Sequence, residues 1–375
     1  MRRYTVTMTA LPPLPVEIVT RADRLDAAVE AMLGCREIAL DTESNSFFRY
    51  PEQLCLIQIA TREKVYIIDT IVLQDIAPLE AVLADAAIGK VIHGSDYDIR
   101  SLDRHYRFRI RGLFDTGVAA RFAGATKFGL AALTEDLLQV TIPKTKQLQR
   151  ADWGRRPLSA EALDYAASDV RHLFTLQEIL AGRLQSLGRT EWVAEEFCRL
   201  EEIKYVPPDP ETAYLSVKGA SDLDGRGLAI LRSLCLFRES EARRQHRPHF
   251  YIVPDAELIS LAMNPGEAGR QRIGPGLEKA LREGMAAPPV VRPASVEYER
   301  MSPEQFQRLV RLKAWRVALG AALSLDPSLL WPMASLERLA RAPDTLDAEL
   351  TSTGIRRWQR DRFAVSLSAC LESVS

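Results

Sequence analysis

Two carboxylates stand two residues apart at the end of an apolar segment of this 375-residue chain. Residues 38–40 are followed by Asp41 and, after one threonine, by Glu43. In a β-strand, side chains at positions i and i+2 point to the same face, so the two carboxylates would lie side by side. Neighbouring anions repel each other, and clustered carboxylate oxygens suit Mg²⁺ or Mn²⁺. The alternative is that Asp-Thr-Glu only ends a strand and enters a loop.

Further acidic residues follow at two later positions. Ser95 is expected to cap a helix whose first turn contains Asp96 and Asp98, and capping would account for one of these aspartates. The other would remain for chemistry. Tyr165 and Asp169 are four residues apart in a helical pattern and therefore share one helix face.

If both helices pack against the first strand, four carboxylates and a tyrosine converge. Such a group requires cations in a cleft of low dielectric constant. Two Mg²⁺ ions ~3.5–4 Å apart would activate a water and stabilise the leaving oxygen of an in-line displacement at phosphorus. Tyr165, with an ordinary pKa of ~10, would orient the attacking water rather than act as its base.

Apolar segments of strand and helix length alternate in the first half of the chain and predict a mixed α/β sheet. Strands are expected at residues 16–20, 37–41, 54–60, 65–68 and 90–93. Helices are expected at residues 24–33, 76–86, 114–122, 129–138 and 160–184. The third and fourth strands are separated by four polar residues, which predicts a hairpin beside a central opening strand. No Gly-x-Gly-x-x-Gly follows the first strand, which argues against a dinucleotide-binding fold.

Composition limits the class of protein. A chain of 375 residues is too long for one ordinary core, and 47% hydrophobic with 26% charged residues is typical of soluble globular proteins. The formal net charge of −1 means that nucleic acid would have to be bound by local basic patches. Five cysteines without a Cys-x-x-Cys pair argue against a disulfide framework or a zinc site and indicate a cytoplasmic protein. No segment reaches the ~18 apolar residues of a membrane span.

Proline-rich segments at residues 204–211 and 286–294 divide the chain. We therefore expect a flexible lead-in at 1–15, an α/β domain at 16–203, and two helical domains at 212–286 and 295–375. The helical parts form a repeat: Val253-Pro254, followed by apolar residues at 258, 261 and 262, recurs as Trp331-Pro332, followed by apolar residues at 336, 339 and 340. A long amphipathic helix is expected before each block, at 227–244 and 303–323.

Three motifs occur in order along the chain. The first is Asp-Thr-Glu-Ser-Asn-Ser, followed by Tyr-Pro-Glu-Gln-Leu-Cys-Leu-Ile-Gln-Ile. The second is Val-Ile-His-Gly-Ser-Asp-Tyr-Asp-Ile, which runs on to Leu-Phe-Asp-Thr. The third is Gln-Arg-Ala-Asp-Trp-Gly-Arg-Arg-Pro-Leu, followed by Asp-Tyr-Ala-Ala-Ser-Asp-Val. Together they resemble the ribonuclease D family of the DEDD exonuclease superfamily, and the C-terminal repeats resemble HRDC modules.

The resemblance implies a ribonuclease H-like fold, two divalent ions and a defined set of ligands. The metal-binding acids of the family fall on Asp41, Glu43, Asp98 and Asp169. Its pattern selects Asp98 over Asp96, because the ligand precedes the apolar residue that is Ile99 here. Tyr165 places the chain in the tyrosine subclass. His172 follows Asp169, so it cannot be the histidine that precedes the aspartate in the proofreading subclass. Ser44 stands where tRNA-processing members usually carry a large apolar residue, which puts the particular RNA in doubt.

Several residues near this group are candidates for binding nucleic acid, each with a bland alternative. Basic and amide side chains before the last motif would contact phosphates, or would simply belong to a solvated loop. An aromatic side chain after Glu43 would stack on terminal bases, or would cover the edge of the core. A basic cluster near residue 245 would contact phosphates, or would be a solvated helix end. The candidates are Lys146, Gln149, Arg150, Phe47, Arg243, Arg244 and Arg247; Trp153 is expected to pack in the core.

We therefore predict a metal-dependent 3′–5′ exoribonuclease that releases nucleoside 5′-monophosphates from RNA, with tRNA precursors or other small structured RNAs as substrates. The expected protein is a cytoplasmic monomer that does not bind membranes. Two alternatives stay open at this point: a 3′–5′ DNA exonuclease in repair, and a catalytically inactive RNA-binding scaffold.

Overall fold

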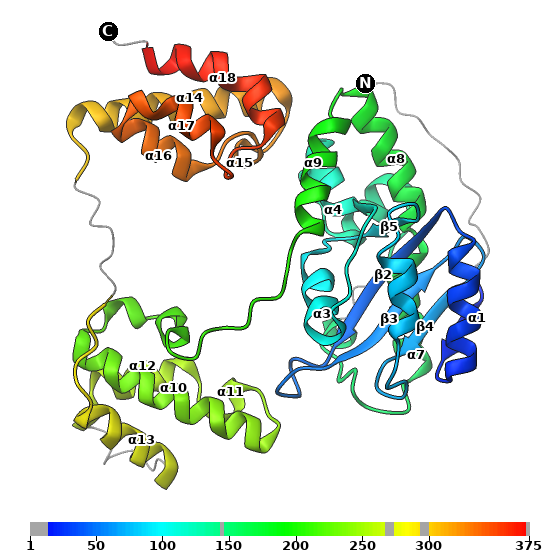
Figure 1. Cartoon of the computed structure of the whole chain (residues 1–375), viewed down its shortest axis with the longest axis horizontal. Coiled ribbons are helices and arrows are strands. Elements are labelled where there is room, and N and C mark those ends of the chain that lie inside the picture. The colour runs from blue at the N-terminus through cyan, green and yellow to red at the C-terminus, as the bar shows by residue number, and fades with distance from the viewer. Residues whose placement is uncertain (1–13, 143–145, 267–273, 293–299, 373–375) are drawn as a thin grey trace.

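The computed structural model describes residues 14–142, 146–266, 274–292 and 300–372 (Figure 1). The predicted lead-in at 1–15 therefore falls almost entirely outside the described residues. Within the described part of the chain, no helix is both long enough and apolar enough to cross a membrane.

A six-stranded mixed sheet forms the N-terminal half, as predicted (Figure 1). Its strand order is β1-β4-β3-β2-β5-β6. The strands are β1 (Val16–Val19), β2 (Glu37–Ser44), β3 (Leu54–Ala60), β4 (Val65–Asp69), β5 (Gly89–Ile92) and β6 (Leu113–Asp115). Strand β2 lies in the middle, antiparallel to β3 of the predicted hairpin and parallel to β5.

Strand β2 runs three residues further than predicted, to Ser44. It continues because Thr42 and Glu43 pair with Ile57 and Leu56 of β3, and β3 is buried along its whole length. The extension decides the orientation of Asp41 and Glu43, because both remain within the ladder and share one face of the sheet.

Nine helices follow or flank these strands in the described N-terminal part. They are α1 (Ala22–Leu33), α2 (Glu80–Leu83), α3 (Asp96–Tyr106), α4 (Thr116–Phe122), α5 (Leu130–Leu133), α6 (Lys146–Gln149), α7 (Ala160–Arg171), α8 (Leu173–Ser186) and α9 (Thr190–Glu201).

Several of the predicted helices differ in type or extent. Of the predicted helix at 76–86, Ala77–Leu79 is a 3-10 helix and only Glu80–Leu83 is α-helical, and in the predicted helix at 129–138 the last five residues form a π-helix. Residues 113–115 form strand β6, because Phe114 pairs with Val91 of β5, and helix α4 begins only after Asp115. The predicted helix at 160–184 is two helices. The break lies at His172, whose backbone N–H bonds to the carbonyl of Val170 and so leaves the i to i−4 ladder.

The C-terminal helices repeat, as predicted. They are α10 (Gly225–Gln245), α11 (His249–Ile252), α12 (Asp255–Met263), α13 (Pro275–Ala286), α14 (Pro303–Leu323), α15 (Pro327–Leu330), α16 (Met333–Arg341), α17 (Leu346–Thr351) and α18 (Arg357–Glu372). Helices α10, α11 and α12 begin at residues 225, 249 and 255, and α14, α15 and α16 begin at 303, 327 and 333, with identical lengths. Each member of the second set lies 78 residues after its counterpart, so one helical unit occurs twice.

Helices α14–α18 pack against the N-terminal α/β part of the chain. The indoles of Trp192 on α9 and Trp358 on α18 stack with centroids 4.7 Å apart, and Phe122 of α4 meets Trp358 edge-on at 5.6 Å. The Glu195 carboxylate accepts backbone N–H groups of Arg357 and Trp358 at the start of α18. These helices share one hydrophobic core with the sheet, whereas α10–α13 enclose a second core.

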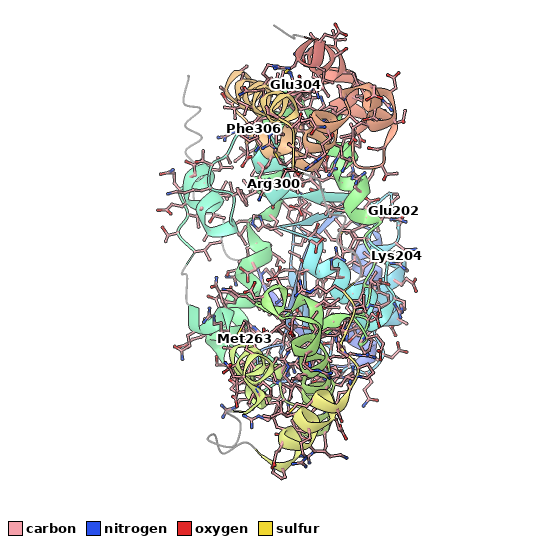
Figure 2. The ribbon with its side chains drawn as sticks, turned by 90° about the vertical axis from the view of Figure 1, so that its left-hand side faces the viewer. Glu202, Lys204, Met263, Arg300, Glu304 and Phe306 are labelled. Atoms are coloured by element: carbon pink, nitrogen blue, oxygen red, sulfur yellow. The ribbon has the colours of Figure 1, made fainter. Side chains whose placement is uncertain are left out.

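Two connections lead into and out of α10–α13. Figure 2 shows Glu202 and Lys204 where the chain leaves α9, and Met263 at the end of α12. It also shows Arg300, Glu304 and Phe306 at the start of the last helical unit.

Candidate active site

Three carboxylates meet at the rim of the central strand. Asp41 and Glu43 of β2 and Asp169 of α7 offer oxygens that all lie within 4.8 Å of one another. Helix α7 lies across β2, β3 and β4. It buries Ala162, Ala166, Ala167 and Val170. These small side chains let the helix approach the sheet closely, so that Asp169 reaches the two strand carboxylates.

Asp98 lies in the first turn of α3 and is buried beside this group, although it does not belong to the set of three. Its Oδ1 accepts a hydrogen bond of 2.5 Å from the Thr42 hydroxyl. The predicted capping role of Ser95 was wrong, because the Ser95 hydroxyl donates to Asp115 and makes no cap bond. Asp98 is therefore held against β2 by Thr42, with its second oxygen outside that bond.

Burial raises the pKa of all four acids, and neighbouring carboxylates raise it further for Glu43, Asp98 and Asp169. Desolvation in the cleft raises the pKa of Asp41 to about 7 and, together with Asp41, that of Asp169 to about 8. Desolvation and the charges of Asp41, Asp169 and Asp98 raise the pKa of Glu43 to about 10. The pKa of Asp98 is also raised, by burial and by Asp41. In the described part of the chain no lysine, arginine or histidine forms an ion pair with these four residues.

This donor set fits a hard divalent cation. It consists of carboxylate oxygens, which are the ligands that Mg²⁺ and Mn²⁺ prefer. Without a cation, repulsion between the carboxylates disfavours their ionisation. A cation would offset that repulsion and return the acids to their ionised forms.

Tyr165 lies one turn before Asp169, as predicted, and lines a pocket with it. The pocket has a volume of about 190 Å³ and is otherwise lined by Gly129, Leu130, Ala131, Ile142 and Gln149. Burial, then Asp169 and Glu43, raise the pKa of the Tyr165 phenol above its ordinary value. The phenol therefore keeps its proton at neutral pH and can orient a water but not deprotonate it.

An ion pair between Arg156 and Asp69 attaches the segment before α7 to the sheet, and the sequence had suggested no role for this arginine. The Arg156 guanidinium donates to both oxygens of buried Asp69, with Nε–Oδ2 at 2.5 Å and Nη2–Oδ1 at 2.7 Å. Its Nη1 donates to the Trp153 carbonyl. Trp153 is only 1% exposed, which confirms the predicted packing role. The sequence signal was present: an arginine in the third motif and an aspartate at the end of β4.

The predicted nucleic-acid residues near this cleft lie in two places. Phe47, 48% exposed after β2, stands beside Arg150, whose guanidinium carbon is 5.9 Å from the ring centre. Gln149 lines the pocket with Tyr165. Lys146 begins α6, but its side chain lies outside the described structure.

The arginines of the basic cluster at the end of α10 make more contacts within the protein than predicted. Arg243 pairs with Glu239 at 2.5 Å and Arg244 pairs with Glu241, whereas Arg247 lies 5.0 Å from the ring of Tyr251. Two of these three arginines thus have carboxylate partners on their own helix.

The same helix end contacts the loop after β2 through Tyr50. The Tyr50 hydroxyl donates to Glu239 at 2.7 Å, and its ring lies 4.3 Å from that of His249. Phe250 and Tyr251 next to this contact are about half exposed, and sequence reasoning missed both. Their signal was an aromatic pair directly after a basic cluster.

A larger hollow of about 840 Å³ lies elsewhere, at the beginning of β2. Three of its charged groups have partners, since Arg62 pairs with Glu37 and Glu178, and Lys64 pairs with Glu17, and among the described residues no group of three potential metal ligands lies there. We therefore place the chemistry at the carboxylates and not in this hollow.

Residues 16–185 match the protein family described as 3′–5′ exonuclease. Ribonuclease D of Granulibacter bethesdensis is 31% identical over 363 residues, which is 92% of this chain and 90% of the relative. Ribonuclease D of Gluconacetobacter diazotrophicus is 30% identical over 368 residues, which is 94% of this chain and 91% of that relative. The chain belongs to the ribonuclease D family. It is accordingly a 3′–5′ exoribonuclease, as predicted.

Solved structures show the same fold. Escherichia coli RNase D, an exoribonuclease involved in structured RNA processing, superposes with a TM-score of 0.71 at 23% identity and covers 96% of this chain and 99% of that one. The catalytic core of RRP6 from Trypanosoma brucei gives 0.63 at 27% identity, over 72% of this chain and 79% of that one. The first comparison shows that the shared fold includes both the mixed sheet and the helices that follow it.

Repulsion in the cleft predicts a pH-dependent stability of the metal-free protein. Because the folded-state pKa values of Asp41, Glu43 and Asp169 lie above the ~4 of an unfolded chain, their contribution is fully present below about pH 4 and is lost as pH rises through 7 to 10. Replacement Glu43→Gln should therefore raise the unfolding free energy in EDTA at pH 8.5 by roughly 1–3 kcal/mol and change it little at pH 4. Urea denaturation at both pH values measures this; an equal gain at both would contradict the repulsion.

The Arg156 clamp predicts a linked loss of stability and activity. Removing one partner of a largely buried ion pair costs roughly 3 kcal/mol, so Arg156→Ala should destabilise the protein by about that amount. It should also slow RNA trimming at temperatures where the variant is folded, because α7 loses its anchor. Arg155→Ala, an exposed neighbour, is the matched control. Normal trimming by folded Arg156→Ala protein would show that the clamp does not position α7.

Proposed function

We propose that this exoribonuclease trims the 3′ ends of tRNA precursors or other small structured RNAs and releases nucleoside 5′-monophosphates. The observation that supports the proposal is a group of mutually repelling carboxylates beside the Tyr165 pocket, to which no described basic residue is paired. Two divalent ions, Mg²⁺ or Mn²⁺, would be held by Asp41, Glu43, Asp98 and Asp169. When bound, they would activate a water and stabilise charge on the leaving oxygen.

The protein's own groups position the reactants in this mechanism. Tyr165 keeps its proton and holds the attacking water by a hydrogen bond in line with the scissile phosphate. Thr42 holds one oxygen of Asp98 through its hydroxyl, which leaves the other oxygen outside that bond for an ion. The pocket beside Tyr165 receives the terminal nucleoside, with Gln149 at its edge.

The RNA strand would leave the cleft over aromatic and basic side chains. Phe47 with Arg150, and Tyr251 with Arg247, are two pairs in which a guanidinium faces a ring. In such pairs the ring stacks on bases and the guanidinium binds phosphates, and neither contact depends on the RNA sequence. Arg243, Arg244 and Lys146 would add phosphate contacts where the strand passes them.

The helical repeats would hold the folded body of the RNA. In this proposal residues 16–203 form the exonuclease domain, and residues 212–286 and 295–375 form two HRDC-like domains. The protein would act as a monomer in the cytoplasm, and matched RNA and DNA oligonucleotides would establish its preference, since sugar discrimination depends on the 2′-hydroxyl.

Substitutions on α7 test the catalytic assignment. Asp169→Asn should lower kcat more than about 100-fold through loss of metal, and Tyr165→Phe should lower it about 10²–10⁴-fold with metal still bound. Trimming of 3′-extended tRNA in Mg²⁺, with and without EDTA, measures both effects. Asp164→Asn on the same helix is the control, because its side chain is 72% exposed. Trimming that survives EDTA or Asp169→Asn would contradict the mechanism.

Phe47 tests the path of the RNA. In the inactive Asp169→Asn background, Phe47→Ala should weaken binding of a single-stranded 3′ end roughly 5- to 100-fold, because one stacked base contributes ~1–3 kcal/mol. Fluorescence anisotropy with a labelled oligonucleotide measures the change. Phe306→Ala on α14, a phenylalanine of similar exposure (Figure 2), is the control. Equal affinities for the Phe47 variant and its parent would remove Phe47 from the path.

A further inference from the structure

Gln58 is a buried amide in the middle of β3 whose polar atoms lack partners. Its side chain has no solvent exposure, and neither Nε2 nor Oε1 has a hydrogen-bond partner. Leaving such a group unsatisfied costs ~1–3 kcal/mol per atom, so a purely structural glutamine at this position would weaken the sheet. The residue therefore requires a reason other than packing.

The register of the sheet places Gln58 next to the catalytic acids. Gln58 lies directly opposite Asp41 in the antiparallel ladder of β2 and β3. Directly opposed residues point to the same face, with Cβ atoms ~4.5–5.5 Å apart. The two side chains are therefore neighbours on one face, although the structure shows no hydrogen bond between the Gln58 amide and the Asp41 carboxylate.

Most other neighbours on this face are apolar or already paired. On its other side β4 presents Ile67, and Asp69 further along β4 is held by Arg156. Above the sheet, α7 buries alanines and a valine, and its acid Asp169 belongs to the same carboxylate group as Asp41. Of the side chains that β2, β4 and α7 bring to this position, Asp41 is the polar group directly opposite.

We propose that Gln58 is a positioning residue for Asp41. When a divalent ion is bound, the Gln58 side chain turns so that its Nε2 donates a hydrogen bond to one carboxylate oxygen of Asp41 and thereby directs the other oxygen toward the ion. Hydrogen bonds of this kind fix the orientation of ligating carboxylates, and their loss typically costs 10–100-fold in metal affinity. The inference rests on the proposed metal site.

If Gln58 positions Asp41, replacing it should change the affinity for metal without lowering the stability of the protein. Replacement Gln58→Met keeps the volume and removes both unpartnered atoms, so the metal-free protein should be as stable as the wild type or more stable. Its affinity for metal should nevertheless fall. A glutamine that only fills the core would give the same stability change with no change in affinity.

Binding of Mn²⁺ alone to the full chain tests this directly. Titration followed by the electron paramagnetic resonance signal of free Mn²⁺ should give a Kd 10–100-fold higher for Gln58→Met than for the wild type. Gln58→Asn, which keeps the amide but shortens its reach, should show the same loss and serves if the methionine variant does not fold. RNA trimming by either variant should recover at saturating Mn²⁺. Gln177→Met on α8 is the control, because its Oε1 is likewise buried without a partner.

The outcomes distinguish the two proposals. If Gln58→Met binds Mn²⁺ within twofold of the wild type, or if Gln177→Met loses as much affinity, the positioning role is overturned. If the wild type binds no Mn²⁺, or binds it as tightly after Asp41→Ala, the metal site itself is wrong and the role of Gln58 falls with it.

Discussion

Electrostatic repulsion among buried carboxylates is the constraint on which the rest of the site depends. Asp41, Glu43 and Asp169 approach within 4.8 Å at the rim of β2, with Asp98 behind them. The arrangement raises all four pKa values and costs folding free energy in the absence of a cation. Coordination of a divalent ion turns the same cost into metal affinity, because the ion replaces the protons that the folded acids retain.

The surrounding elements oppose this repulsion by holding the acids mechanically. The ladder of β2 fixes Asp41 and Glu43 on one face, and the hydroxyl of Thr42 between them binds Asp98. The Arg156–Asp69 pair ties the approach to α7 to the end of β4. The site is therefore rigid because three separate segments are each anchored to the sheet.

The sequence carried much of this account, for reasons that can be named. The spacing of Asp41 and Glu43 and of Tyr165 and Asp169 follows from strand and helix periods, and the helical repeat was visible in the buried positions after Val253 and Trp331. The partners of single polar side chains were not predictable. The Ser95 hydroxyl bonds to Asp115 instead of capping its own helix, and Arg243 forms an ion pair with Glu239 on the same helix. Gln58 lies within the first motif, but its lack of hydrogen-bond partners appears only in the folded sheet.

The central claim is that these carboxylates are metal ligands. Anomalous diffraction from crystals soaked in Mn²⁺ tests it most directly. We predict two peaks ~3.5–4 Å apart in contact with oxygens of Asp41, Glu43, Asp98 and Asp169. Absence of any peak among these residues at saturating Mn²⁺, in crystals of protein that trims RNA, would contradict the account.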